Sequence, residues 1–237
     1  MKVKFSHILF FIGILLQGTL LSAQDYSFMS DPPDDFQYLD TTPQKRKFFN
    51  EHMIGVKYGV NVSNVRSTPK INQSSILTYN NITVNYTFYH VLWDRMANFG
   101  LQIGAKYGCE GYESEYSNYG ETCKIVEIPM LSQFHINFSS FRLLVDVGPY
   151  YGYRLSTDRE GGFDKYDQRH DYGIIAGAGF AIVLRPIELH LEACYKFALA
   201  SMYHANKYSD LYWLYCYPSN IMFTLGINLH LDKKREK

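Results

Sequence analysis

The sequence predicts an all-β fold, an eight-stranded antiparallel transmembrane β-barrel, and three observations carry this prediction. Eight segments alternate between apolar and polar or small residues, which is the period of a β-strand. Beyond the N-terminal segment, no run of about 18 apolar residues is present to form a transmembrane helix. The connections between the eight segments are alternately long and short, which is typical of transmembrane barrels.

The N-terminus has the composition of an export signal. Two lysines precede an apolar run that ends just before Ser22 and Ala23. Small residues at this point suit a signal peptidase, so we expect a signal peptide at residues 1–23, cleaved after Ala23. The alternative is an uncleaved membrane anchor. Residues 24–50 are polar, rich in Asp and Pro and without a period, and we expect them to form a flexible segment.

The barrel itself is expected at residues 51–231. Its alternating segments are 54–63, 82–89, 99–108, 126–138, 141–154, 172–182, 187–197 and 221–231. Each is close to the 9–11 residues that cross a bilayer when tilted. Long polar connections lie at 64–80, 109–122, 155–170 and 200–218, and shorter ones lie at 90–98, 139–140 and 185–186. We therefore expect long outer loops, short periplasmic turns and a basic periplasmic tail at 232–237.

The two faces of these segments differ in charge. One face is apolar in all eight segments, and the representatives we expect to contact lipid are Val56, Tyr58, Ile103, Ile128, Val145, Ile174, Leu191 and Leu225. The other face carries glycines and charged residues: Lys57, Lys106, Glu127, Arg142, Asp146, Arg154, Glu188, Glu192 and Lys196. A soluble barrel or sandwich would instead bury its apolar face in a closed core and expose the charged one.

The charged face would line a lumen that is only wide enough for side chains. Charges in such a confined space must pair, and we expect a salt-bridge network that plugs the lumen. A selective channel lined by charge is the alternative. A two-residue turn at Ser139 and Ser140 sets Asn137 opposite Arg142, and Gln133 opposite Asp146. Paired residues of the third and fourth segments must share a face, and one register that meets this condition sets Lys106 opposite Glu127, where their opposite charges stabilise the pair.

The chain has four cysteines, Cys109, Cys123, Cys194 and Cys216. Export permits disulfides. Cys109 and Cys123 flank one polar loop, which makes them the candidate pair, and free thiols are the equal alternative. The register above sets Cys109 opposite Lys124, so a bridge requires the strand pairing to end by about Gly108.

Composition argues against several functions. Without Lys2 and Lys4, the mature chain has 23 − 2 = 21 basic and 23 acidic residues, a charge of −2, which argues against a nucleic-acid-binding protein. His135 and His190 lack metal-ligand spacing, and no catalytic motif is present, so we expect no metal, no cofactor and no enzyme activity. A hydrolase at the outer rim would have to use Asp164, His170, Asp171, His204 and Asp210.

The last long loop is rich in aromatic residues. Tyr203, Tyr208, Tyr212, Trp213, Tyr215 and Tyr217 lie in it or next to it. Exposed aromatic side chains can anchor a binding partner. This loop is therefore the candidate surface for a receptor-like function towards a partner or a glycan.

Three stretches resemble the PorT-type outer-membrane β-barrel family of Bacteroidota. Residues 127–131 (EIPML) resemble the family's E-I-P-L-L strand, and residues 148–153 (GPYYGY) resemble its G-P-Y-x-G-Y strand. Asp171 and the glycines that follow it resemble a D-x-G-x-x-x-G-x-G strand, which ends on Glu in the family and on Ala181 here. The resemblance covers roughly residues 50–231. It implies an outer-membrane location and a link to protein secretion of the type IX kind.

Together these observations predict a non-enzymatic outer-membrane barrel with a plugged, charge-paired lumen, which is structural or assists protein secretion. The receptor and the rim hydrolase are the alternatives. The expected partners are outer-membrane lipid and secretion-machinery proteins, without nucleic acid. We expect the barrel to be a monomer.

Overall fold

A computed structural model describes residues 51–70, 72–90, 99–114, 121–138, 140–207 and 213–231. The expected signal peptide, the segment 24–50 and the tail 232–237 lie outside these residues. None of the described residues belongs to a helix long and apolar enough to cross a membrane. The strands are β1 (Glu51–Thr68), β2 (Gln73–Ser74), β3 (Ile76–His90), β4 (Phe99–Ser114), β5 (Glu121–Phe138), β6 (Phe141–Thr157), β7 (His170–Leu184), β8 (Ile187–Ala198) and β9 (Tyr215–His230).

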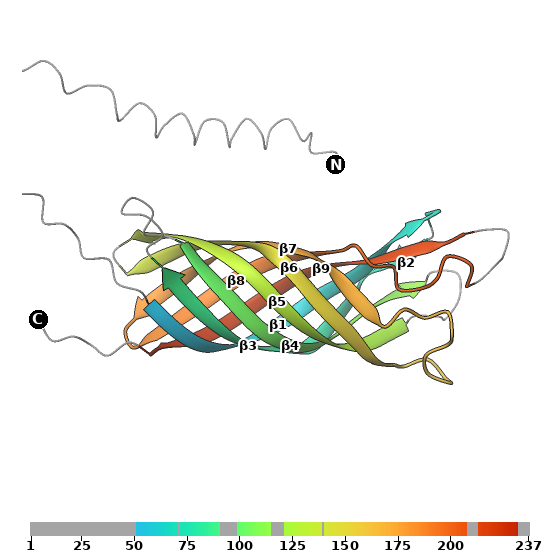
Figure 1. Cartoon of the computed structure of the whole chain (residues 1–237), viewed down its shortest axis with the longest axis horizontal. Helices are drawn as coiled ribbons and strands as arrows, with labels where there is room; N and C mark the ends of the chain where they lie inside the picture. The colour runs from blue at the N-terminus through green and yellow to red at the C-terminus, as the bar shows by residue number, and fades with distance from the viewer. Residues whose placement is uncertain are drawn as a thin grey trace, which may run out of the picture. The chain divides into compact units, whose positions relative to one another are not determined.

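The eight long strands form a closed antiparallel barrel (Figure 1). Each long strand pairs with the next one along the chain, and β9 returns to pair with β1. The pairing of β4 with β5 completes the circle. The two-residue strand β2 only adds to the tip of β4. The predicted eight-stranded barrel is therefore confirmed.

The two ends of the barrel differ in their connections. The turn side carries Ser140 and the turn at residues 185–186, and β1 begins and β9 ends on this side. There, the His230 N–H donates to the Pro186 carbonyl over 2.8 Å. The loop side carries the connections at residues 158–169 and 199–214. These two names, turn side and loop side, are kept below.

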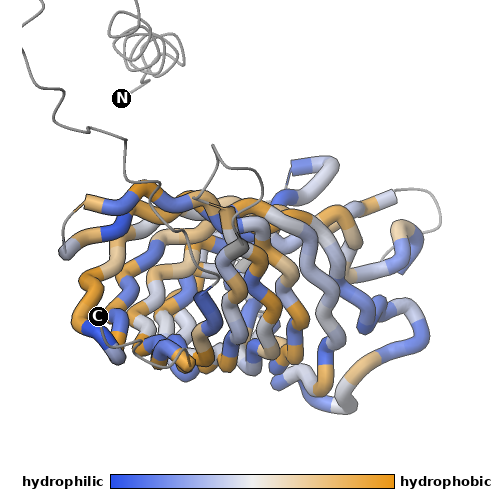
Figure 2. The backbone as a smooth tube through the Cα atoms, turned by 60° about the vertical axis from the view of Figure 1, so that its left-hand side comes forward, coloured by the Kyte–Doolittle hydropathy of each residue, from blue (hydrophilic) through white to orange (hydrophobic). Residues whose placement is uncertain are grey.

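The apolar face is the outside of the barrel. All eight side chains predicted to contact lipid are exposed, from 45% for Leu191 to 60% for Leu225. In Figure 2, apolar and polar positions alternate along the tube of each strand. The eight side chains predicted to contact lipid therefore do not pack into a closed core, and the soluble alternative is wrong.

The predicted strand registers are also present. Phe138 pairs with Phe141, Asn137 with Arg142 and Gln133 with Asp146. Lys106 pairs with Glu127 across β4 and β5. Because the registers follow from face parity, one correct turn sets the pairing of β5 with β6 from Phe138 back to Ile125, where a bulge shifts the register.

The strands extend further towards the loop side than the sequence predicted. The pairing of β4 with β5 does not end at Gly108 but continues to Tyr112, which pairs with Glu121. The alternation simply continues through these more polar residues, with Glu110, Tyr112 and Cys123 buried on the inner face. The predicted loops are correspondingly too long.

This extension rules out the candidate disulfide. Cys109 pairs with Lys124 on the outer face, while Cys123 pairs with Glu110 and is buried inside. The two side chains therefore point to opposite sides of the barrel wall. All four cysteines are free thiols, so of the two alternatives for Cys109 and Cys123 the structure has the free thiols and not the bridge.

Glycines on the inner face make room for large polar side chains. A Cβ atom on Gly100 would lie 2.3 Å from the Tyr89 ring, and one on Gly55 would lie 1.8 Å from the Asn228 amide oxygen. Neither neighbour could stay in place. Long side chains thus fill the lumen, and they pack over glycines on the neighbouring strand.

The outward position of Val145 gives a first prediction. Substitution Val145→Arg in the middle of β6 should destabilise the barrel in lipid by about 2–4 kcal/mol, because a charge would face hydrocarbon. Leu77→Arg, at the loop-side end of β3, should cost about 0–1 kcal/mol. Urea unfolding in liposomes measures both changes. Equal costs at the two sites would contradict the assignment of the outer face to lipid.

Candidate functional site

The inside of the barrel is the candidate site, and its side chains form three layers. The turn-side cluster contains Lys57, Arg142, Asp146, Glu188, His190 and Glu192. The apolar layer contains Leu131, Tyr150, Ile175, Cys194 and Met222. The loop-side cluster contains Lys106, Glu110, Glu127, Arg154, Asp171 and Lys196.

The order of inward residues along single strands fixes this layering. Along β8, the inward positions are Glu192 of the turn-side cluster, then Cys194 of the apolar layer, then Lys196 of the loop-side cluster. Along β6, Asp146 precedes Tyr150, and Arg154 follows. Five of the eight long strands, β5 to β9, thus contribute apolar residues that lie between the two groups of charges.

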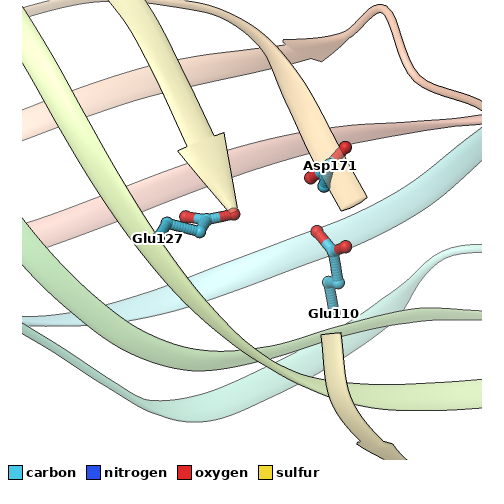
Figure 3. A group of neighbouring side chains, drawn as sticks. All are labelled: Glu110, Glu127 and Asp171. Carbon is cyan, nitrogen blue, oxygen red and sulfur yellow. The ribbon is translucent and has the colours of Figure 1, made fainter. Parts of the chain in front are cut away.

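The loop-side cluster is organised around Lys196. Its ammonium lies 2.7 Å from the carboxylates of both Glu110 and Asp171 and also pairs with Glu127. The same ammonium lies 4.6 Å from the centre of the Tyr150 ring. Figure 3 shows Glu110, Glu127 and Asp171 pointing towards one another from three different strands. Their convergence depends on a cation between them.

The remaining members balance the charge of the loop-side cluster. Lys106 lies 2.7 Å from Glu127, and Arg154 lies 3.3 Å from both Glu110 and Asp171. Three cations therefore meet three carboxylates. The three carboxylates have the spacing of a metal site, but the Lys196 ammonium occupies the position between them. The arrangement is that of an internal salt-bridge network.

The turn-side cluster is built around two further cations. Lys57 lies 2.6 Å from Glu192 and donates to the Gln102 amide oxygen over 3.1 Å. Arg142 lies 3.5 Å from Glu188 and 3.1 Å from Glu51 at the turn-side rim. The Lys57–Glu192 pair bridges β1 and β8 over β9, and the Arg142–Glu188 pair bridges β6 and β8 over β7. The Arg142–Glu51 pair joins opposite walls of the barrel, since β7, β8 and β9 lie between β6 and β1.

His190 connects the carboxylates of this cluster. Its Nδ1 lies 3.0 Å from Glu192, its Nε2 lies 3.3 Å from Glu188, and the ring is fully buried. A neutral imidazole has only one N–H, so it would leave a lone pair facing a carboxylate. A doubly protonated ring donates towards both, and with Lys57 and Arg142 it balances Asp146, Glu188 and Glu192. The geometry therefore favours a cationic His190.

A fourth layer closes the lumen on the loop side. This cap consists of Val65, Tyr112, Cys123, Met202, Tyr203 and Cys216, with Phe163 and Leu214 packed against them. The two long loops are joined by backbone hydrogen bonds, from Gln168 to Met202 over 2.9 Å and from His204 to Tyr166 over 2.8 Å. The loops therefore fold over the mouth of the barrel.

Polar contacts hold the cap to the wall. The Tyr203 hydroxyl donates to Glu121 of β5 and lies 3.2 Å from the Tyr112 hydroxyl. Burial, with Tyr112 and Glu121 nearby, raises the pKa of Tyr203, so this hydroxyl stays protonated and remains a donor. Asp167 pairs with both Arg159 and Lys207, which come from the two different loops.

The sequence predicted the inner face of the barrel correctly but missed two residues of the loop-side cluster. All nine charged residues predicted for the lumen are buried. Glu110 was assigned to a loop, and Asp171 to a rim that could serve a hydrolase, yet both lie in the loop-side cluster. The signal was the unbroken alternation from Lys106 through Gly108 to Glu110.

The other predicted surface residues do not gather in one site. Tyr203 is only 2% exposed, in the cap, whereas Trp213 is 62% exposed. Tyr215 and Tyr217 stack on each other within β9, and Tyr208 and Tyr212 lie outside the described residues. Of the rim candidates, His170 hydrogen-bonds the Tyr151 hydroxyl on the outer wall, while Asp171 faces the lumen. Asp210 also lies outside the described residues.

Comparison with protein families assigns the chain. The model described as "Outer membrane protein beta-barrel domain" matches residues 37–204, which is more than half of the sequence. The chain belongs to this family. The barrel is therefore an outer-membrane barrel, and its apolar outer face is the face that meets lipid. A search among curated proteins gives no significant match.

Several solved barrels are similar at low identity. Ail of Yersinia pestis, solved in complex with the heparin analogue sucrose octasulfate, is 14% identical with a TM-score of 0.45, over 77% of this chain and 99% of Ail. Neisserial surface protein A is 12% identical with a TM-score of 0.48, over 74% and 96% of the two chains. OprG from Pseudomonas aeruginosa is 11% identical with a TM-score of 0.48, over 76% and 96%. None of these likenesses bears on function.

The charge balance of the outer-membrane barrel's loop-side cluster gives a second prediction. Lys196→Met should cost about 3–5 kcal/mol, because three carboxylates would then share two cations in a buried site. Adding Asp171→Asn restores the balance and should recover part of this loss, which urea unfolding measures. If the loss of unfolding free energy in the double variant equals the sum of the losses in the two single variants, the result would contradict a coupled network.

Asp167 in the cap gives a third prediction. Burial raises the pKa of Asp167, but hydrogen bonds from Lys207, from the backbone N–H of Asp164 and from Arg159 outweigh burial and hold the pKa below its ordinary value. A depressed carboxyl pKa contributes stability above the ordinary value and loses that contribution as the pH falls through the folded value. The cap should therefore loosen below about pH 4 while the strands stay protected.

Hydrogen exchange of residues 158–169 at several pH values measures this loosening. Asp167→Asn should loosen the cap already at neutral pH, because a neutral amide cannot pair with two cations. The exposed Glu160 in the same loop provides a matched control, and Glu160→Gln should leave exchange unchanged. If Asp167→Asn exchanges like the wild type, Asp167 does not hold the cap.

Proposed function

We propose that this protein is a non-enzymatic, non-conducting outer-membrane barrel that acts through its surfaces, as a structural or accessory component of protein secretion. The observation that carries the proposal is the filled lumen, in which two charge clusters, an apolar layer and a cap follow one another. A continuous water path through the barrel would have to disrupt both charge clusters, the apolar layer and the cap. The barrel wall has no unpaired long edge, which supports a monomer.

The link to secretion rests on the resemblance to PorT-type barrels. The three resembling stretches lie on the consecutive strands β5, β6 and β7, and one residue of each meets at Lys196. These are Glu127 of EIPML, Tyr150 of GPYYGY, and Asp171 before the glycines. Tyr150 also donates to Asp171 over 3.2 Å. The resemblance thus concerns residues that interact, which supports a shared internal plug rather than chance similarity.

A filled lumen predicts the electrical behaviour of the barrel. Wild-type protein in planar bilayers should give no unitary conductance steps, because an apolar layer and paired charges exclude water. The double variant Tyr150→Ala, Ile175→Ala removes bulk from the apolar layer and should leak. Stable steps from the wild type would contradict the closed lumen.

The secretory role is tested in the native host. Deleting the gene should lower the amount of secreted protein in the medium and raise it in the periplasm, and wild-type protein should restore secretion. Genes for secretion machinery next to this one would agree with such a role. Unchanged secretion after deletion would overturn the proposed role in secretion but would not affect the proposal that the barrel is non-conducting.

A further inference from the structure

Two cations at the loop end of β1 differ from those of the lumen. Each buried lumen cation has a carboxylate within 4.0 Å, for example Lys57 with Glu192 and Lys196 with Asp171. Arg66 and Lys70 have no carboxylate partner among the residues that the structure describes. Within that part of the chain, no carboxylate neutralises their charge.

The guanidinium of Arg66 is held in a fixed position. Its Nη2 donates to the Ala198 carbonyl over 3.0 Å, and its central carbon lies 3.8 Å from the centre of the Phe197 ring and 5.8 Å from that of Tyr217. Its Nε is buried and has no hydrogen-bond partner. A planar donor group that is stacked and only partly used is pre-organised for a planar or tetrahedral oxyanion.

A pocket of about 520 Å³ adjoins this arginine. It is lined by Asn64, Val65, Arg66, Ser67, Lys70, Asn72 and Gln73. The lining thus includes two cationic residues together with residues that carry amide and hydroxyl groups. Such a lining matches a ligand with both negative charge and sugar-like hydroxyl groups.

The outer wall next to Arg66 is apolar. Three exposed side chains lie on it: Phe197 and Tyr195 of β8 and Ile221 of β9. Phe197 is nearest to the loop-side end of its strand, Tyr195 is further from it, and Ile221 is furthest. Arg66 lies where this apolar wall meets the polar loop side, which is the level of lipid head groups in an outer-membrane barrel. A ligand at the pocket can therefore extend an acyl chain along the wall.

We propose that the Arg66–Lys70 pocket binds the phosphorylated sugar head group of an outer-leaflet glycolipid. Arg66 and Lys70 pair with the phosphate, the Gln73 amide oxygen, which has no hydrogen-bond partner, accepts from a sugar hydroxyl, and the acyl chains lie against Phe197 and its neighbours. Among the described residues, Glu113 of β4 pairs with Ser74 of β2. It lies opposite the β2 edge and not in the pocket lining.

Native mass spectrometry of the full barrel in non-ionic detergent tests the proposal. The probes are diphosphorylated lipid A, its dephosphorylated form and inorganic phosphate. The wild type should bind diphosphorylated lipid A at least about tenfold more tightly than the variant Arg66→Gln, Lys70→Gln, because two charge-assisted contacts are lost. It should bind the dephosphorylated form no more tightly than that variant does.

Lys124 provides a matched control, since it is an exposed outward lysine at the loop side of β5, away from the pocket. Lys124→Gln should bind like the wild type. Lys70→Gln alone keeps the test valid if Arg66→Gln does not fold, because Lys70 is exposed and the substitution removes no internal contact. Equal binding by the wild type and the pocket variants would overturn the site. Binding of inorganic phosphate that displaces lipid A and depends on Arg66 would overturn the glycolipid assignment.

Discussion

Closure of the sheet is the constraint on which the rest of the structure depends. In a bilayer, every backbone N–H and carbonyl must be paired within the protein, so a sheet can cross only if its first and last strands meet. Here β1 pairs with both β3 and β9, and no long strand keeps a free edge. Closing at eight strands leaves a lumen of side-chain width. The identity of the inward residues therefore decides whether the barrel is a pore or a plug.

Those inward residues are charged because the outer wall has to be apolar. Period-two alternation sends the charged residues in the middle of the strands inward, as for Lys106, Glu127 and Lys196, and a narrow lumen has little water to solvate them. The charges are tolerated because each is paired, as Lys196 is with Glu110 and Asp171. Such pairs add little net stability, since desolvation offsets most of the attraction, but removal of one partner is costly. The network thus fixes which strands face each other across the lumen.

The layering has a consequence for function. Leu131, Ile175 and their apolar neighbours lie between the two charge clusters on five of the eight long strands, which opposes a continuous polar path through the lumen. The cap adds a second apolar barrier, which the Asp167 pairs hold in place. Interaction with other molecules is then left to the loops and to the outer wall. Both the accessory role in secretion and the glycolipid pocket at Arg66 agree with a barrel that works from its surface.

The sequence by itself determined the strands, the lipid-facing side and the local registers, because alternation and turn length act between neighbours in the chain. It therefore paired Lys106 with Glu127 correctly. It did not reveal where the alternation stops, since polar strand ends resemble loops, and so Glu110 and Asp171 were placed outside the barrel. Only the tertiary structure decided which charges meet across the lumen. Lys57 and Glu192 are 135 residues apart, and their contact depends on the tilt and stagger of the closed sheet. No local pattern carries that information.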